Sequence, residues 1–380
     1  HHADTPLLGR FSLPRSARSQ LRIESLAAKT TVKATVSVLI ALLLITSMRW
    51  TGGMITIAIT AMIVTLPTIG ASWNKALQRV AGVLIGVVLG IVILVVVEAN
   101  TDDVFWILLA AWAGGSIAGW VMAGPWETSY VGVQVGIALC LVMGSAAPSA
   151  NLDGPLERVT GILIGVIIAI VIMRVLWPVW ARRQVCASLS EAAQLLASML
   201  EVGLRSPQEE ANLRPKNGWS YAVSWAISEA SRYREEARYE RGLAPSRSSP
   251  ILTLSTLLYD ALPRVILIVQ YRLEYRHDQV NGSLSELVAF RESIERRLHQ
   301  IASLVMGANV QIEDLEHHRR RAHEVLSDEV SDLSPQDQRA QLQIMGFYHE
   351  LIPVLDEMVP AAREAAQMFL DQGEKLQSAG

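Results

Sequence analysis

The residues with the clearest chemical potential are cations placed where strongly apolar segments begin. Lys75 and Arg79 open one such segment, and Arg158 opens another. Ionisable side chains in a membrane segment are costly, so they are functional candidates. Two arginines, each at the positively polarised N-terminus of a helix, would attract a carboxylate or another anion, with Lys75 assisting at the mouth of the path. The alternative is that they are interfacial anchors that reach the lipid headgroups.

Three neutral side chains are candidate contacts for such an anion. Tyr130 and Gln134 are candidate polar contacts, and Trp73 is a candidate stacking surface, although all three also suit helix packing or the membrane interface. No combination of nucleophile, base and orienting group stands out, and no phosphate-binding or zinc-binding spacing occurs. We therefore expect neither an enzyme nor a cofactor or metal site.

Acidic residues are missing where proton coupling would need them. No Asp or Glu falls in the middle of an apolar segment. A proton-coupled transporter usually needs a titratable group on its path. Three interpretations stay open: coupling through a peripheral carboxylate such as Glu127, a group supplied by a missing part of the protein, or a passive path.

The composition is that of an integral membrane protein. Of 380 residues, 51% are hydrophobic and 18% are charged, and the net charge is −3. Soluble domains carry about 25% charged residues. Disorder and disulfide scaffolds are excluded, and no basic surface predicts nucleic-acid binding.

Six apolar segments approach the length of about 20 residues that a helix needs to cross a bilayer. The second and fifth are short, with Pro67 and Gly144 at their ends, so broken or tilted helices are expected there. The six segments cover residues 31–50, 53–69, 76–97, 104–123, 129–147 and 159–179.

The distribution of Lys and Arg predicts the orientation. These residues gather in the N-terminal flank, in the loop after the second segment and after the sixth segment, whereas the loop after the third is acidic. The positive-inside rule then puts both termini in the cytoplasm. The expected domains are an N-terminal flank at 1–28, a six-helix transmembrane domain at 29–181 and a cytoplasmic helical domain at 182–380.

An internal repeat accompanies these segments. Residues 77–86 read almost as residues 156–165, with Arg79 and two glycines in register with Arg158 and two glycines. Because the copies are three helices apart, the second would be inverted in the membrane, as in transporters with a 3+3 inverted repeat. Chance similarity of two apolar helices is the alternative.

The second half of the chain predicts an all-helical bundle. Amphipathic helices are expected at 184–202, 218–241, 251–277, 282–306, 309–331 and 335–375. The cluster at 316–323 contains three histidines, but none of them are four residues apart, so a solvated or headgroup-facing stripe is expected rather than a metal site.

Five motifs follow one another in the first half of the chain, at residues 50–53, 66–82, 129–134, 153–165 and 176–178. In this order they resemble the fusaric acid resistance (FUSC) or aromatic acid exporter family. The similarity covers about residues 25–185.

The resemblance implies export of aromatic carboxylic acids or related drugs across the bacterial inner membrane. It also implies a periplasmic adaptor and an outer-membrane channel as partners. Many members carry two six-helix halves, and these motifs look most like the second half. A chain that begins His1-His2 rather than with Met fits a fragment that lacks the first half.

The expected function is therefore export of organic anions by a multi-pass inner-membrane transporter. A homodimer or a fused second half is expected, and nucleic acid is not. Two alternatives remain. One is a passive organic-anion channel, since the plant aluminium-activated malate channel is a more distant six-helix relative. The other is a membrane scaffold that transports nothing.

Overall fold

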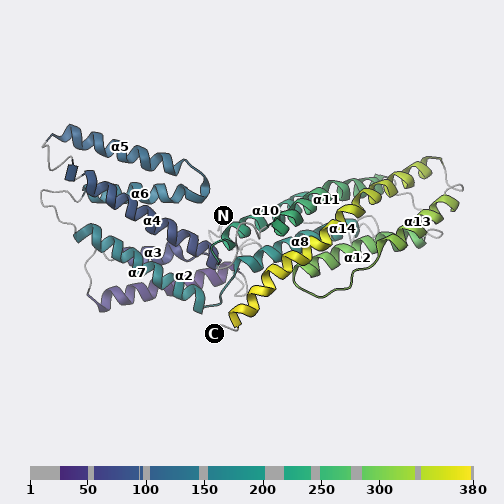
Figure 1. The fold of residues 1–380 in the computed structure, drawn as a ribbon, viewed down its shortest axis with the longest axis horizontal. Coiled ribbons are helices and arrows are strands. Elements are labelled where there is room, and N and C mark those ends of the chain that lie inside the picture. The colour runs from purple at the N-terminus through teal and green to yellow at the C-terminus, as the bar shows by residue number, and fades with distance from the viewer. Residues whose placement is uncertain are drawn as a thin grey trace, which may run out of the picture. The chain divides into compact units, whose positions relative to one another are not determined.

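The chain folds into two compact units, His1–Trp180 and Ala181–Gly380. The computed structural model describes residues 26–49, 55–93, 95–96, 103–144, 153–201, 218–240, 249–274, 285–329 and 335–377. Within these ranges there are twelve α-helices and no strand (Figure 1). The predicted all-helical class is confirmed for this part of the chain. Most of the predicted N-terminal flank lies outside the described residues.

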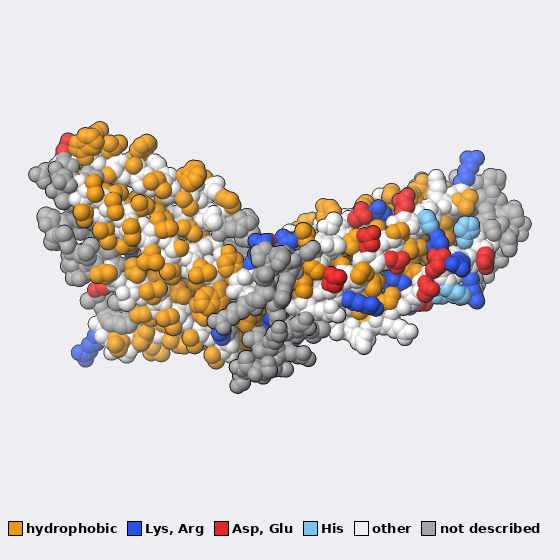
Figure 2. All heavy atoms as spheres, viewed as in Figure 1, with side chains coloured by type: hydrophobic (Ala, Val, Ile, Leu, Met, Phe, Trp, Pro, Cys, Tyr) orange, Lys and Arg blue, Asp and Glu red, His pale blue; other side chains and the backbone are white. Residues whose placement is uncertain are grey.

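The first unit contains six helices with strongly apolar outer faces. Hydrophobic side chains cover most of its visible surface in Figure 2. On α5 even Trp112 and Trp120 are 70% and 80% exposed. An apolar surface of this extent suits lipid rather than water, so the protein is embedded in a membrane. The helices are α2 (Leu26–Ser47), α3 (Thr56–Val64), α4 (Ile69–Ile93), α5 (Val104–Met122), α6 (Trp126–Gly144) and α7 (Asp153–Val175).

Helix lengths in this unit are unequal. Four helices, α2, α4, α5 and α7, are long and apolar enough to cross a bilayer. The apolar part of α6, Thr128–Met143, is shorter. Helix α3 has 9 residues, which is about 14 Å against a hydrocarbon core of about 30 Å. Six full-length spans are thus not seen in the described residues.

The sequence predicts a loop between the second and third apolar segments. This prediction is wrong, because α4 already begins at Ile69. Thr68 caps this helix: its Oγ1 accepts a hydrogen bond from the Ala71 N–H at 3.1 Å. Ser72 Oγ accepts from the Leu66 N–H at 3.0 Å and so closes the turn from α3.

The early start of α4 changes the position of the cations. Lys75 lies in the second turn and Arg79 in the third, and Arg158 lies in the second turn of α7. The helix dipole acts mainly within the first turn. The expectation that these cations stand at helix N-termini is therefore wrong, and any attraction for anions depends on their own charges.

Glycines bring the helices of this unit into close contact. A Cβ at Gly82 would lie 2.6 Å from the Gln134 Cβ, and one at Gly86 would lie 2.6 Å from the Ala138 Cβ. Helix α4 therefore packs closely against α6, as small residues permit in lipid. Since both contacts advance together along the chain, α4 and α6 run parallel.

Helices α7 and α3 form a second contact of the same kind. A Cβ at Gly165 would lie 2.6 Å from the Ile57 carbonyl oxygen and 2.7 Å from the Thr60 Cβ. The two halves of this unit make equivalent contacts. Helix α4 packs against α6 as α7 packs against α3, and α2 packs against α3 as α5 packs against α6. These pairs are related by an exchange of α2, α3 and α4 with α5, α6 and α7. The similar segments 77–86 and 156–165 thus occupy equivalent positions.

The second unit is a bundle with one large core. Its helices are α8 (Ala181–Glu201), α10 (Trp219–Ala237), α11 (Ser249–Glu274), α12 (Ser285–Val305), α13 (Leu315–Glu329) and α14 (Pro335–Gln377). Part of α11, Pro250–Tyr271, is also long and apolar enough to cross a membrane. The sequence interpretation had assigned it to the soluble bundle. Here Leu254, Leu258 and Val265 are fully buried in the bundle core, which accounts for the apolar run.

A buried carboxylate caps the first helix of the second unit. Glu240 is 4% exposed and accepts hydrogen bonds from the Ala181 N–H at 2.6 Å and the Arg182 N–H at 3.3 Å. These are amides that the helix itself leaves unpaired. The negative charge also complements the positive end of α8.

Glu240→Ala is expected to lower the free energy of unfolding of the second unit by about 1–3 kcal/mol, because buried amides lose their acceptor. Urea denaturation followed by circular dichroism measures this change. Glu235→Ala is the matched control. Glu235 pairs with Arg234 and Arg238 at the surface, so a change below about 1 kcal/mol is expected. Equal effects of the two variants would contradict the capping role.

Candidate functional site

The centre of the candidate site is a guanidinium group buried in the first unit. Arg79 of α4 is 3% exposed. Its Nε donates to Thr60 Oγ1 at 3.1 Å, and its Nη1 donates to the Tyr130 hydroxyl at 2.8 Å. Helices α3, α4 and α6 thus converge on one cation. Both acceptors are neutral, so they orient the charge without cancelling it.

Lys75 adds a second positive charge one turn earlier on α4. Its Nζ lies 3.3 Å from the centre of the Tyr130 ring, a close cation–π contact. Tyr130 therefore holds Arg79 through its hydroxyl and Lys75 through its ring. The two cations are close enough to repel each other.

Gln134 provides an unpaired acceptor beside this group. It follows Tyr130 by one turn on α6 and is 3% exposed. Its Oε1 is buried and has no hydrogen-bond partner among the described residues. Because an unsatisfied buried acceptor costs about 1–3 kcal/mol, this oxygen calls for a donor such as a water molecule or a hydroxyl group of a bound ligand.

Arg158 lies in the second turn of α7, a helix that packs against α4. The Ile69 N–H donates to the Val179 carbonyl at 3.0 Å, so the start of α4 adjoins the chain that follows α7. The Nε of Arg158 is buried without a hydrogen-bond partner. Its charge and that of Arg79 are close enough to repel.

No counter-ion compensates these charges in the part of the chain that the structure describes. Lys75, Arg79 and Arg158 form no ion pair with a carboxylate there. Buried charges are normally paired, since desolvation is costly. The arrangement therefore favours a bound anion.

The structure brings together four of the six predicted residues: hydrogen-bonded and ring contacts join Lys75, Arg79 and Tyr130, and Gln134 adjoins them one turn further along α6. Arg158 lies on α7, and no hydrogen bond or ion pair joins it to this group among the described residues. The sixth, Trp73, is half-buried on α4. In the described residues it has no hydrogen bond or ring contact with this group. Trp73 is therefore separate from the cation cluster, which consists of Lys75 and Arg79.

Two polar residues of this unit escaped the sequence interpretation. Thr60, which accepts from Arg79, lies within a short apolar helix and had no distinguishing pattern. Lys33 lies at the edge of the first apolar segment and was not a candidate residue, yet it is 0% exposed and its Nζ has no hydrogen-bond partner among the described residues. The spacing of Lys33, Ser37 and Ala41, which form the buried face of α2, could have shown that this lysine faces inward.

One group in the described residues has ligands that could hold a metal ion. Glu201 of α8 and Glu295 and His299 of α12 place their ligand atoms within 4.8 Å of one another. Two of the three lie four residues apart on one helix, as metal ligands often do. The group is partly exposed, and nothing else about it indicates a bound ion.

Together, the apolar helices and the interior cations define a class of protein. In the part of the chain that the structure describes, it is an all-helical membrane protein whose embedded unit contains cations without an ion pair. Comparison with known proteins identifies the family. The model of the fusaric acid resistance protein family matches residues 28–378, and the chain belongs to this family.

Individual relatives match over a shorter length. The chain is 25% identical to the multidrug resistance protein MdtO of Escherichia coli O6:H1 over 178 residues, which is 45% of this chain and 25% of that protein. It is 24% identical to the MdtO protein of Shigella flexneri over the same length. The match spans only a quarter, 25%, of the length of these curated relatives.

Proposed function

We propose that the protein exports organic anions across the membrane and that Arg79 is the principal anion-binding residue. One observation carries this proposal. The Arg79 guanidinium is buried in an apolar helix, and among the described residues it is held only by the neutral hydroxyls of Thr60 and Tyr130. A carboxylate that replaced lost hydration would satisfy the charge.

The neighbouring side chains suit the rest of such a substrate. Lys75 and Arg158 flank Arg79 along α4 and α7 and would draw an anion in from either end of the path. The unpaired Oε1 of Gln134 would accept a hydroxyl or N–H group of the substrate. An aromatic carboxylic acid that carries a hydroxyl group fits both requirements.

Family membership and the name of the relatives support efflux as the direction of transport. The family is named for resistance to fusaric acid, an aromatic carboxylic acid, and MdtO is named as a multidrug resistance protein. Aromatic acids or related drugs are therefore the proposed substrates. No step of the proposal requires catalysis.

The proposed arrangement in the cell follows from the distribution of Lys and Arg along the sequence. Residues 29–181 form the membrane domain with six crossings, in which α3 and its neighbouring turn make a broken crossing. Residues 182–380 lie in the cytoplasm, and the membrane is the bacterial inner membrane. The exchange that relates α2–α4 to α5–α7 supports an inverted repeat.

Partners are part of the same proposal. A Cβ at Gly115 or Gly119 of α5 would meet nothing within 4 Å. This open stripe of small residues supports contact with a second copy or a second six-helix half. A periplasmic adaptor and an outer-membrane channel would complete the export route.

Flux of labelled 4-hydroxybenzoate into proteoliposomes, with and without an imposed pH gradient, tests the proposal. Arg79→Gln keeps polarity but removes the charge and is expected to reduce flux by about tenfold or more, the loss expected for one charge-assisted hydrogen bond. Arg174→Gln is the matched control, because Arg174 is an exposed arginine in the last turn of α7. It should transport as wild type does.

The outcomes separate the alternatives. Accumulation that needs the gradient and is lost in Arg79→Gln supports a coupled exporter. Flux that ignores the gradient but is lost in Arg79→Gln indicates a passive anion channel. Wild-type flux in Arg79→Gln would refute the role of Arg79, and absence of flux from every form would favour the scaffold.

A further inference from the structure

A pocket of about 410 Å³ lies in the second unit. It is formed by α12, α13 and α14. Phe290, Leu342, Met345 and Ile352 provide apolar walls. Gly346 lies on the same wall, and a Cβ there would meet nothing within 4 Å. The glycine thus leaves space that a large side chain at this position would occupy.

Nitrogen donors line the polar side of this pocket. They are Arg319 and His323 of α13 and His349 of α14. Arg319 Nη1 and His349 Nδ1 are 3.0 Å apart. Because a guanidinium only donates, Nδ1 accepts, and the proton of the neutral imidazole lies on Nε2, where it can be donated to a ligand.

The same side carries more positive than negative charge. Glu316 forms two hydrogen bonds with Arg319, both at 2.7 Å, and a third with Arg320 at 3.2 Å. Hydrogen bonds from Arg319 and then Arg320 lower the pKa of the Glu316 carboxyl to about 2. One carboxylate therefore serves two guanidinium groups, and this group of three side chains keeps one net positive charge beside the pocket, which Arg319 lines and Arg320 does not.

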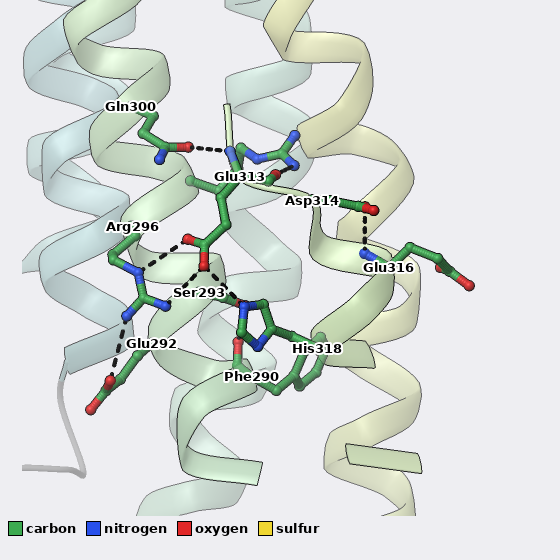
Figure 3. A network of polar contacts seen from close by, with 10 residues as sticks. Phe290, Glu292, Ser293, Arg296, Gln300, Glu313, Asp314, Glu316 and His318 are labelled. Carbon is green, nitrogen blue, oxygen red and sulfur yellow. Dashed lines mark hydrogen bonds and ion pairs between the residues drawn. The ribbon is translucent and has the colours of Figure 1, made fainter. Parts of the chain in front are cut away.

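A polar network fixes the helix that carries these donors (Figure 3). Glu313, just before α13, binds Arg296 of α12 at 3.2 Å and His318 of α13 at 2.9 Å. Its carbonyl oxygen also accepts from Arg297, which pairs with Asp356 of α14 at 3.0 Å. The donors thus stand on a helix tied to both neighbours, so the pocket is largely preformed.

We propose that this pocket binds a small organic anion with an apolar body, such as an aromatic monocarboxylate, at a site separate from the transport path. The carboxylate would lie against Arg319, His323 and His349, and the ring against Phe290, Met345 and Ile352. Apolar walls with a few placed donors are typical of ligand sites. The second unit would thereby sense the concentration of an anion independently of its transport.

Binding of 4-(trifluoromethyl)benzoate to the full chain in detergent, followed by ¹⁹F NMR, tests this site. All measurements are made on protein that carries Arg79→Gln, which weakens anion binding at the cation cluster. Binding that remains can then be assigned to the pocket of the second unit, whether or not Arg79 takes part in transport. Gly346→Leu fills the pocket and is expected to abolish binding. Gly346→Ala adds one methyl group in open space and should bind as the parent does.

The charge requirement has its own controls. Arg319→Gln is expected to weaken binding roughly tenfold or more. Arg320→Gln, which also loses a bond to Glu316 but does not line the pocket, should change affinity less than about threefold. The neutral 4-(trifluoromethyl)benzamide should bind much more weakly. Unchanged binding in Gly346→Leu, or equal affinity for the acid and the amide, would overturn the proposal.

Discussion

Arg79→Met is expected to give a protein that is more stable to heat than the wild type and unable to transport organic anions. Arg79 is buried with two neutral acceptors and no carboxylate among the described residues. A methionine of similar length removes the desolvated charge and keeps the packing. Replacing buried charges by apolar side chains can stabilise a protein by about 1–4 kcal/mol.

Thermal unfolding in detergent measures this effect, with an expected rise of about 3 °C or more in Tm. Arg174→Met is the control, because that arginine is exposed and its loss should leave Tm nearly unchanged. Tyr130→Phe removes the hydroxyl that Arg79 uses and should lower Tm. A fall in Tm for Arg79→Met would mean that the guanidinium stabilises the fold and is not held ready for a ligand.

Gly132→Ala is expected to destabilise the membrane unit strongly. A Cβ at Gly132 of α6 would lie 2.3 Å from the Met122 amide nitrogen and 2.6 Å from the Ala118 carbonyl oxygen. Both atoms belong to the backbone of α5, so no side chain can move aside. The expected cost is more than about 3 kcal/mol, at the upper end for overpacking.

Fluorescence-detected size-exclusion chromatography after graded heating measures the loss of folded protein. Gly136→Ala is the matched control, since a Cβ at Gly136 on the same helix would lie 3.6 Å from the Ala118 Cβ, an ordinary van der Waals distance. That variant should elute and melt as the wild type does. If Gly132→Ala behaved like its control, the close packing of α5 on α6 would be refuted.

The helices of the second unit could be predicted well where end signals are local. The last helix was expected at 335–375 and is observed at Pro335–Gln377. By contrast, the helix expected at 309–331 begins only at Leu315. Gly307 adopts a φ of 84°, and Asp314 Oδ1 accepts from the Glu316 N–H at 3.0 Å, so an extended segment precedes the helix. Since Asp is a typical helix-capping residue, the later start of this helix could have been predicted from Asp314.

The candidate site could be predicted in composition but not in geometry. Arg79 and Lys75 stand out in an apolar sequence because charges are rare there. The residue that orients Arg79 from α3 could not be found, because Thr60 is one of several threonines in apolar surroundings. The polar residues Asn74 and Lys75 suggested a loop where the structure has the first turns of α4. Thr68, a typical capping residue, could have indicated the earlier start of this helix.

The glycines of α4 have a consequence for movement. Gly82, Gly86 and Gly90 contact α6 at successive turns, opposite Gln134, Ala138 and Val142. Because this ridge repeats every four residues, α4 could slide along α6 by about 6 Å and place one glycine where the next had been. Such a slide would carry Arg79 away from Tyr130 while the helices stayed in contact. After such a shift the buried charge would sit at a different depth in the membrane.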